Sequence, residues 1–300
     1  AHARAVIQRH DLQRLRITGR ALALRRTGGG LVADTSAGEV AARRVLLAVG
    51  LGEQPHWPPW AEALHRQGAS VDHIFAADFP PLEVPGDGPT VVVGGGITAV
   101  QTALAAAARF PGGVTLLSRH DLRPSPYDFD PCWIGPKCLR RFQAADLDER
   151  RRAVDEARVR GSVTAEVLAE LGQALEAGRL GLRRGRVVGA EAREGRVRLQ
   201  LSDGPLRAGR VVLATGFRSD PPGGPLLAQI IRDFHLPCHA CGYPVVGPDL
   251  QWGAGIHAAG PLAELALGPC ARNIVGARNA GRLLLAAAAQ ERTGPAHPDL

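Results

Sequence analysis

Alternation of apolar and polar residues predicts two β-hairpins that lie far apart in the sequence. The first pairs Arg20–Arg25 with Leu31–Thr35 across the glycines at 28–30, and the second pairs Arg186–Arg193 with Arg196–Ser202 across a Glu-Gly turn. Alternation with a period of two, broken by glycine, is typical of strands with one face in the core and one in solvent. We therefore expect antiparallel β-structure in both halves of the chain.

Short runs of consecutive apolar residues predict a second kind of strand, buried on both faces. Val45–Val49, Thr90–Val93 and Val114–Leu117 are runs of this kind. They are typical of parallel sheets covered by helices. An alanine-rich helical stretch joins the second run to the third. The pattern indicates the α/β fold class, with a Rossmann-like three-layer domain around these strands.

The remaining segments divide into helices and loops. Residues 146–180 have helical spacing of apolar positions, interrupted at Gly161, and the chain ends in an apolar helix. The stretch Pro124–Phe142 is rich in proline and aromatic residues, and residues from Pro221 to about Trp252 are rich in glycine and proline. Both are expected to be irregular loops.

The segment that follows each hairpin is repeated. Gly38–Pro55 and Gly204–Pro221 agree at eight of eighteen positions without gaps, at a constant offset of 166 residues. Each copy carries an apolar strand that ends in small residues, Ala48–Gly50 in the first and Ala214–Gly216 in the second. We interpret the agreement as an internal structural repeat.

Between the two copies, the sequence Gly94-Gly95-Gly96-Ile97-Thr98-Ala99 matches the pattern G-x-G-x-x-A. Gly94 permits a tight turn after the strand, Gly96 lets the backbone approach a pyrophosphate, and Ala99 lets the helix pack closely on the sheet. The helix N-terminus supplies N–H donors and positive dipole to the phosphates. The strand before the motif and the helix after it favour dinucleotide binding over a plain strand-helix corner.

The end of the next strand distinguishes the nicotinamide cofactors. An acidic residue there would accept hydrogen bonds from a ribose 2′-hydroxyl, whereas an arginine would pair with a 2′-phosphate. This chain has Ser118-Arg119-His120 and no acid before Asp121. The sequence therefore favours NADP(H) over NAD(H), although an arginine at this position could also be merely solvated.

Composition narrows the function classes. The net charge is +7 and the pI is about 9.9, but the arginines are spread along the chain and Lys137 is the only lysine. Nucleic-acid binding, which needs a clustered basic patch, is not expected. No apolar run reaches the roughly 20 residues that span a bilayer. Five cysteines do not suggest a disulfide framework, so a reducing cytoplasm is the expected location.

Taken together, these motifs resemble those of a known class of proteins. A hairpin followed by a strand ending in A-T-G or a near copy, used twice around a G-x-G-x-x-A unit, resembles the flavoproteins with two dinucleotide-binding domains. Within them, "YDFDPCWIGPKCLRRF" and "GPLAELALGPCARNIVGAR" look most like a bacterial group of FAD/NAD(P)-binding proteins related to the ornithine and lysine N-monooxygenases. The resemblance covers most of the chain from about Val40 to Leu285.

The resemblance implies an NAD(P)-binding domain inserted into a partial FAD-binding domain of the glutathione-reductase-like type. The expected boundaries are residues 1–87 and 222–300 for the FAD-binding part and 88–221 for the NAD(P)-binding domain, with a helical insertion at 124–180. It also implies that NADPH reduces FAD, which passes electrons to O₂ or another acceptor, and that a small-molecule substrate is oxidised. The expected cofactor-binding residues are Gly50, Gly94, Gly95, Gly96, Ile97, Thr98, Ala99, Ser118, Arg119, Ala214, Thr215, Gly216, Gly260 and Pro261, and no catalytic residue is nominated.

The chain departs from this family pattern at its start. Such flavoproteins begin with a strand, glycine turn and helix that grip the FAD pyrophosphate, but no glycine turn followed by a helix is expected before Gly94, since residues 28–30 turn a hairpin. FAD binding by these residues alone is therefore open, and we interpret the chain as lacking that unit. The alternative is a non-catalytic NADP(H)-binding module.

A few other side chains could carry chemistry. The sequence "FHLPCHACGY" holds His235, Cys238, His239 and Cys241, which could form a metal site or a redox dithiol, although an ordinary loop is the favoured interpretation. The remaining tryptophans could stack on a flavin, but packing of loops is favoured for Trp57, Trp60 and Trp133. The pair Asp128 and Asp130 could serve in acid/base chemistry, but solvated side chains are the favoured interpretation, as they are for His257 and Glu264.

Overall fold

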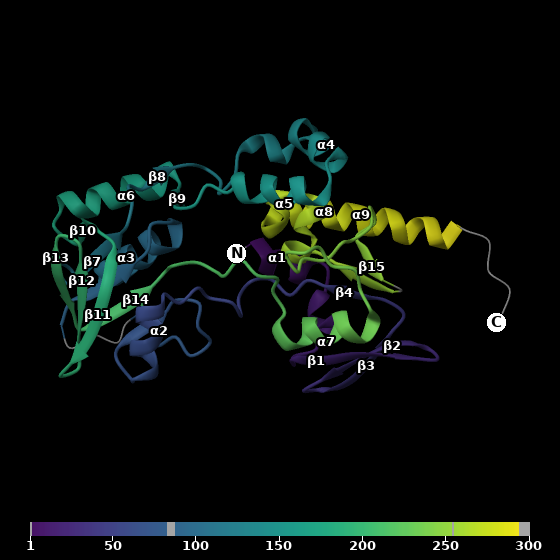
Figure 1. Cartoon of the computed structure of the whole chain (residues 1–300), viewed down its shortest axis with the longest axis horizontal. Coiled ribbons are helices and arrows are strands. Elements are labelled where there is room, and N and C mark those ends of the chain that lie inside the picture. Colours follow the sequence, from purple (N-terminus) through teal and green to yellow (C-terminus); the bar gives the residue numbers. More distant parts are fainter. Residues whose placement is uncertain (1, 83–87, 254, 294–300) are drawn as a thin grey trace.

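The computed structural model describes residues 2–82, 88–253 and 255–293. Figure 1 shows these residues as two lobes linked by extended segments, with helices α4 (Pro136–Ala144) and α5 (Leu147–Glu156) lying over the second lobe. No helix among these residues is both long enough and apolar enough to cross a membrane.

The first lobe is built on a five-stranded parallel sheet. Its order is β10 (Gly181–Arg184), β7 (Val114–Ser118), β6 (Thr90–Val93), β14 (Arg210–Leu213) and β5 (Val71–His73), and every neighbouring pair is parallel. The apolar runs of β6 and β7 lie in the middle of this sheet, as their composition predicts. The α/β fold class is confirmed.

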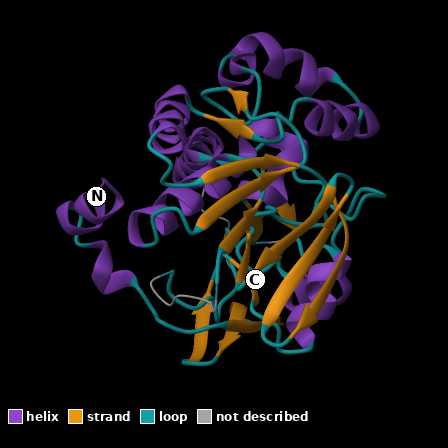
Figure 2. Ribbon diagram, turned by 90° about the vertical axis from the view of Figure 1, so that its left-hand side faces the viewer, coloured by secondary structure: helices purple, strands orange, loops and turns teal. Residues whose placement is uncertain are grey.

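Both faces of this sheet are covered. Helices α3 (Ile97–Arg109) and α6 (Ala165–Glu176) pack on the face that includes Val92 and Leu116. The other face, which includes Val91 and Leu117, packs against α2 (Pro59–Arg66) and the antiparallel strands β11 (Val187–Arg193), β12 (Arg196–Leu201) and β13 (Gly204–Ala208). Figure 2 views the molecule from the side of this lobe. The three-layer arrangement expected from the sequence is thus present.

The second lobe contains two small sheets. One is antiparallel, with β1 (Ala21–Thr27), β2 (Gly30–Thr35) and β3 (Gly38–Ala42). The other has the order β15 (Gln251–Gly253), β16 (Ile256–Ala258) and β4 (Val45–Leu47), with β16 and β4 parallel. Helix α7 (Gly224–Phe234) packs between them on Leu24 and Trp252 in one apolar cluster.

The internal repeat is confirmed and extends further than the sequence agreement. Strands β1, β2 and β3 and strands β11, β12 and β13 have bounds related by the same offset of 166 residues, and each first strand has its register shift at the equivalent place, between Ala21 and Ala23 and between Val187 and Gly189. Equivalent glycines also share positive φ, at +68° for Gly50 and +79° for Gly216.

The two copies differ at the strand that follows. β14 is paired on both edges, with β5 and β6, whereas β4 pairs only with β16 among the described residues. The backbone N–H of Val45 donates to the carbonyl of Gly255, just before β16. The equivalent N–H of Val211 donates to the carbonyl of Ser70, just before β5. The unpaired edge of β4 therefore corresponds to the β6 edge of β14. Leu46 is 47% and Val49 40% exposed, so the prediction that residues 45–49 are covered on both faces is wrong.

Two predicted loops contain helices. The segment 124–142 holds β8 (Arg123–Pro124), the short 3-10 helix η2 (Pro131–Ile134) and the start of α4. The segment after Pro221 holds α7, whose Gly-Pro start resembles a loop in sequence but places proline in the first helical turn, where its missing N–H costs nothing. Gln229 of α7 bonds both backbone groups of Leu24, at 3.0 and 2.8 Å.

The remaining elements flank this framework. The helical stretch 146–180 is confirmed as α5 and α6, with β9 (Ser162–Val163) after the interruption at Gly161. The N-terminal residues form α1 (His2–Arg9) and η1 (Leu12–Leu15), and the C-terminal part forms η3 (Gly260–Ala263), α8 (Glu264–Leu267), η4 (Pro269–Arg272) and the expected long helix α9 (Ile274–Thr293).

Candidate functional site

The glycine turn after β6 is tightly packed on one side. A Cβ atom added to Gly94 would lie 2.5 Å from the carbonyl oxygen of Ala214 and 2.8 Å from Cβ of Ala99. The first glycine and Ala99 therefore let α3 and β14 meet at the corner. A Cβ at Gly95 would lie 2.6 Å from Oγ of Ser118, so the turn also lies against the end of β7.

Gly96 differs from these two positions. It is the N-cap of α3 with an extended backbone, and a Cβ there would meet only Gly161, at an ordinary 3.8 Å. Residues 94–98, including Ile97 and Thr98, are half-buried. The fold itself does not demand glycine at position 96.

The end of β7 lies beside this turn. Ser118 is buried, and its hydroxyl donates to the carbonyl of His120 at 2.6 Å, which holds the turn after the strand. Arg119 is exposed and, within the described part of the chain, makes no hydrogen bond or ion pair. The neighbouring Arg184 of β10 pairs with Asp121 at 3.2 Å. The structure thus brings Ser118 and Arg119 to the same sheet edge as the glycine turn.

The two strand ends of the internal repeat lie side by side where the chain passes between lobes. The N–H of His56 donates to the carbonyl of Gly216 at 2.8 Å, and that of Arg218 to Gln54 at 2.9 Å. The side-chain amide of Gln54 continues the ladder with a 3.0 Å bond to the carbonyl of Pro221. The segments that follow Gly50 and Ala214 are therefore joined into one antiparallel connection.

A buried histidine links Thr215 to this connection. His73 is fully buried, and its Nδ1 accepts the backbone N–H of Phe75 at 3.2 Å. Because Nδ1 is then the acceptor, Nε2 carries the proton and donates to the Thr215 hydroxyl at 3.2 Å, which in turn donates to the carbonyl of His56. Burial, and then the charge of His56, lower the pKa of His73 to about 4. Thr215 therefore has a structural role here.

The second lobe has a comparable sheet edge. Gly50 lies three residues after the end of β4 and Gly260 two residues after the end of its partner β16, with positive φ of +68° and +62°. A Cβ added to either would meet nothing within 4 Å, whereas Pro261 is buried. Ligands of open α/β sheets bind at the carboxyl ends of the strands. The structure places Gly50 and Gly260 together at such an edge, apart from the Gly94 turn of the other lobe.

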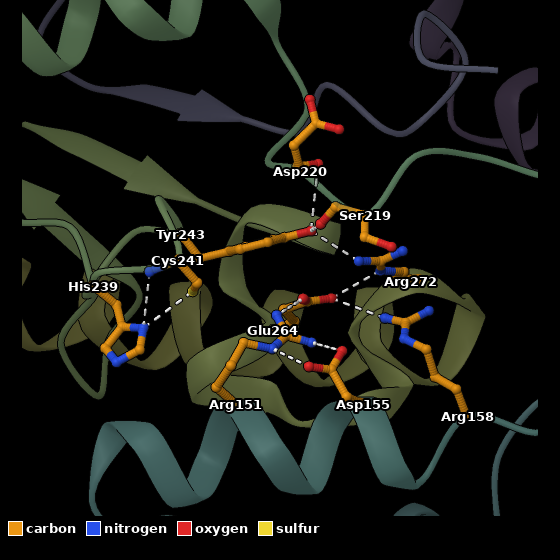
Figure 3. A network of polar contacts seen from close by, with 10 residues as sticks. All are labelled: Arg151, Asp155, Arg158, Ser219, Asp220, His239, Cys241, Tyr243, Glu264 and Arg272. Carbon is orange, nitrogen blue, oxygen red and sulfur yellow. Dashed lines mark hydrogen bonds and ion pairs between the residues drawn. The ribbon is translucent and has the colours of Figure 1, made fainter. Parts of the chain in front are cut away.

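A buried carboxylate that the sequence analysis expected in solvent joins the insertion to the second lobe (Figure 3). Glu264 is fully buried and bonds Arg151, Arg158 at 2.9 Å and Arg272 at 2.8 Å. The arginines come from α5, the loop after it and η4. The expectation that Glu264 faces solvent is wrong, because three guanidinium groups compensate the burial of its charge.

Tyr243 extends this network to the connection between lobes. Its hydroxyl donates to the carbonyl of Ser219 at 3.0 Å and accepts from Arg272 at 2.8 Å. Burial, followed by the charge of Glu264, raises the pKa of Tyr243 to about 12. The phenol therefore stays protonated and keeps donating to the connecting segment at neutral pH.

The other candidates have ordinary structural roles. Asp130 caps η2 by accepting the N–H of Cys132 at 2.8 Å, and Asp128 is exposed. Trp57 packs on His65 and His73, and Trp133 packs edge-on against Phe142. Cys132 and Cys138 form a disulfide that the sequence did not indicate. Among the described residues, no group of three or more His, Cys, Asp or Glu side chains has an arrangement suited to a metal ion.

Comparison with known proteins gives a fold match without a sequence match. No family model and no curated protein matches the chain. The cadaverine monooxygenase DfoA of Erwinia amylovora, solved with FAD, matches 95% of this chain and 71% of its own with a TM-score of 0.70 at 14% identity. The ornithine N-hydroxylase KtzI of Kutzneria sp. 744 matches 92% and 72%, with a TM-score of 0.70 at 17% identity.

A disulfide reductase has the same architecture. The bacillithiol disulfide reductase Bdr of Bacillus cereus matches 96% of this chain and 76% of its own, with a TM-score of 0.58 at 17% identity. Together with the internal repeat and the inserted parallel sheet, these matches show that the chain has the fold of the flavoproteins with two dinucleotide-binding domains.

Proposed function

We propose that the first lobe binds NADP(H) at the turn of Gly94, Gly95 and Gly96. The observation that carries the proposal is the half-buried glycine turn at the N-terminus of the thirteen-residue helix α3. The first-turn amides of Ile97 and Thr98 have no partner within the helix, and the helix dipole adds positive charge at the same place. These donors suit a diphosphate.

Arg119 supports the choice of NADP(H) over NAD(H). It is exposed at the end of β7, next to the turn, and no carboxylate in the described residues neutralises it. An exposed guanidinium group can bind a ribose phosphate in a bidentate manner. Asp121, the nearest acid in sequence, pairs instead with Arg184.

We further propose that the chain belongs to an NADPH-dependent flavoprotein oxidoreductase, monooxygenase-like in activity, with FAD at the edge where Gly50 and Gly260 lie. The support is the open space at both glycines and the fold shared with FAD-dependent hydroxylases. When bound, FAD would accept hydride from NADPH and pass electrons onward. The residues of this chain would hold and orient the cofactors, with Pro261 and η3 fixing the loop after β16.

One observation favours a second candidate, an NADP(H)-binding module without flavin. The edge of β4 that corresponds to the β6 side of β14 has no strand partner among the described residues. In the first lobe that position holds the strand that carries the Gly94 turn. FAD in the second lobe would need an equivalent turn beside β4, and within the described residues none is present.

Anaerobic spectroscopy separates these functions. We expect the chain, mixed with FAD and then with NADPH, to show loss of the oxidised-flavin absorbance faster than FAD mixed with NADPH alone. Calorimetric binding of NADPH without binding of FAD would favour the flavin-free module. Failure to bind either cofactor would contradict both candidates.

A further inference from the structure

The loop between α7 and β15 holds a fixed hairpin turn that contains two cysteines. The N–H of His239 donates to the carbonyl of Tyr243 at 2.9 Å, and that of Gly242 to His239 at 2.8 Å. The indole N–H of Trp252 fixes the start of the loop through Pro237 at 2.7 Å. Tyr243, in turn, is anchored in the Glu264 network. The side chains on this turn are therefore held in place before any ligand arrives.

Two side chains of this turn, Cys241 and His239, form a relay with Asp148 of α5. Nδ1 of His239 lies 3.0 Å from Sγ of Cys241, and Nε2 lies 3.0 Å from Oδ1 of Asp148, on the first turn of α5. The contact between His239 and Cys241 is drawn in Figure 3. A thiol, an imidazole and a carboxylate in this order are the arrangement that activates a cysteine nucleophile.

The backbone fixes which ring nitrogen carries the proton. The N–H of Cys241 points at Nδ1 of His239 at 3.3 Å, and a backbone N–H can only donate. Nδ1 is therefore the acceptor, and Nε2–H donates to Asp148. The same Nδ1 lies closer to the thiol of Cys241, at 3.0 Å, and it gives up the longer bond from the backbone N–H when it takes the thiol proton. Asp148 then faces the positive charge that develops on the imidazole.

We propose that Cys241 is an activated nucleophilic thiol that reacts with small-molecule disulfides, and that Cys238 resolves the product. Cys238 is exposed and Cys241 is half-buried. Cys241 is the attacking sulfur because its thiol, and not that of Cys238, contacts His239. Partial burial of its sulfur, and then the nearby Cys241, raise the pKa of Cys238. The other cysteines do not compete, because Cys270 is fully buried and Cys132 is bonded to Cys138.

The chemical step is a thiol–disulfide exchange. The proton of Cys241 moves to Nδ1 of His239, and its sulfur attacks one sulfur of the disulfide R–S–S–R. The S–S bond breaks, and the leaving thiolate takes the proton from His239 as R–SH. The thiol of Cys238 then attacks the mixed disulfide on Cys241 and releases the second R–SH. The cysteine pair gives up an electron pair to the small disulfide and becomes a disulfide itself.

Dithionitrobenzoate, a coloured small disulfide, tests the proposal on the whole chain. With limiting reagent, the wild-type protein is expected to release both halves of each reagent molecule, and Cys238→Ser to release one half and keep the other on Cys241. In the Cys238→Ser background, His239→Gln is expected to slow the reaction at pH 7 by at least about tenfold, since a positioned base contributes on the order of 10²-fold or more.

Two further variants guard against a merely structural effect. Asp148→Asn changes a side chain that is 83% exposed, so the fold is kept while the relay is cut, and a several-fold slower reaction is expected. His235→Gln replaces an exposed histidine nearby that does not contact Cys241, and no change is expected. Equal rates for His239→Gln and its parent, or labelling that maps to Cys238 before Cys241, would overturn the proposal.

Discussion

The glycine turn gives the sharpest prediction, because its first and third glycines are required for different reasons. In Gly94→Ala, the new Cβ would lie 2.5 Å from the backbone oxygen of Ala214 and 2.8 Å from Ala99. Neither neighbour can move without shifting β14 or α3. Overpacking of this kind costs about 1–3 kcal/mol. We expect Gly94→Ala to lower the free energy of unfolding by that amount.

Gly96→Ala is the matched control. Its Cβ would meet only Gly161, at 3.8 Å, and its φ of −109° is accessible to alanine. The loss of a favourable N-cap residue, worth up to about 1 kcal/mol, is offset by a gain of roughly 0.4–1 kcal/mol from a stiffer unfolded chain. The stability of this variant should stay within about 1 kcal/mol of wild type.

Gly96→Ala should instead lower the affinity for NADPH. A methyl group at position 96 stands where the backbone must approach the diphosphate, and one lost bond to a charged group costs about 1.5–3 kcal/mol. Urea unfolding followed by circular dichroism, with NADPH titration by calorimetry, measures both effects. Wild-type stability in Gly94→Ala, or undiminished NADPH affinity in Gly96→Ala, would refute the reasoning.

Two further predictions concern buried ionisable side chains, Glu264 and His73. Glu264→Gln leaves three arginines without their shared carboxylate and should lower the free energy of unfolding in urea by about 3–5 kcal/mol. Asp155→Asn, on a side chain that is 55% exposed, should lower it by less than about 1 kcal/mol. Equal losses in the two variants would contradict the role of the network. The pKa of His73 is lowered to about 4 in the folded protein, so His73 binds a proton at a lower pH in the folded protein than in the unfolded chain. Stability should therefore fall by about 2 kcal/mol from pH 7 to pH 5, and His73→Gln should abolish that part of the fall.

Local patterns account for what the sequence predicted well. The β6–turn–α3 unit and the repeated hairpins were found because period-two alternation, apolar runs and glycine spacing are local signals. Even the offset of 166 residues could be read from eight identities. The repeat accounts for part of the architecture, because each copy forms a three-stranded antiparallel sheet followed by one strand of a parallel pair.

Features that depend on distant partners could not be predicted. Glu264 looked like a surface residue because its arginine partner Arg151 lies 113 residues away on α5. Helix α7 was missed because its Gly-Pro start looked like a loop. Its apolar face packs on residues that are distant in sequence, such as Leu24 of β1. The Cys241 relay likewise depends on Asp148, which is 91 residues from His239.

The central claim is that the Gly94 turn and Arg119 together bind NADP(H). Calorimetric titration with NADPH and NADH tests this claim most directly when wild type is compared with Arg119→Gln. The control is Arg179→Gln, which changes an exposed arginine just before β10, at the opposite end of the sheet. We predict that NADPH binds about tenfold or more tighter than NADH, since a charge-assisted bond is worth about 1.5–3 kcal/mol, and that only Arg119→Gln removes this preference. Equal affinity for both nucleotides in the wild type, or an unchanged preference in Arg119→Gln, would contradict the claim.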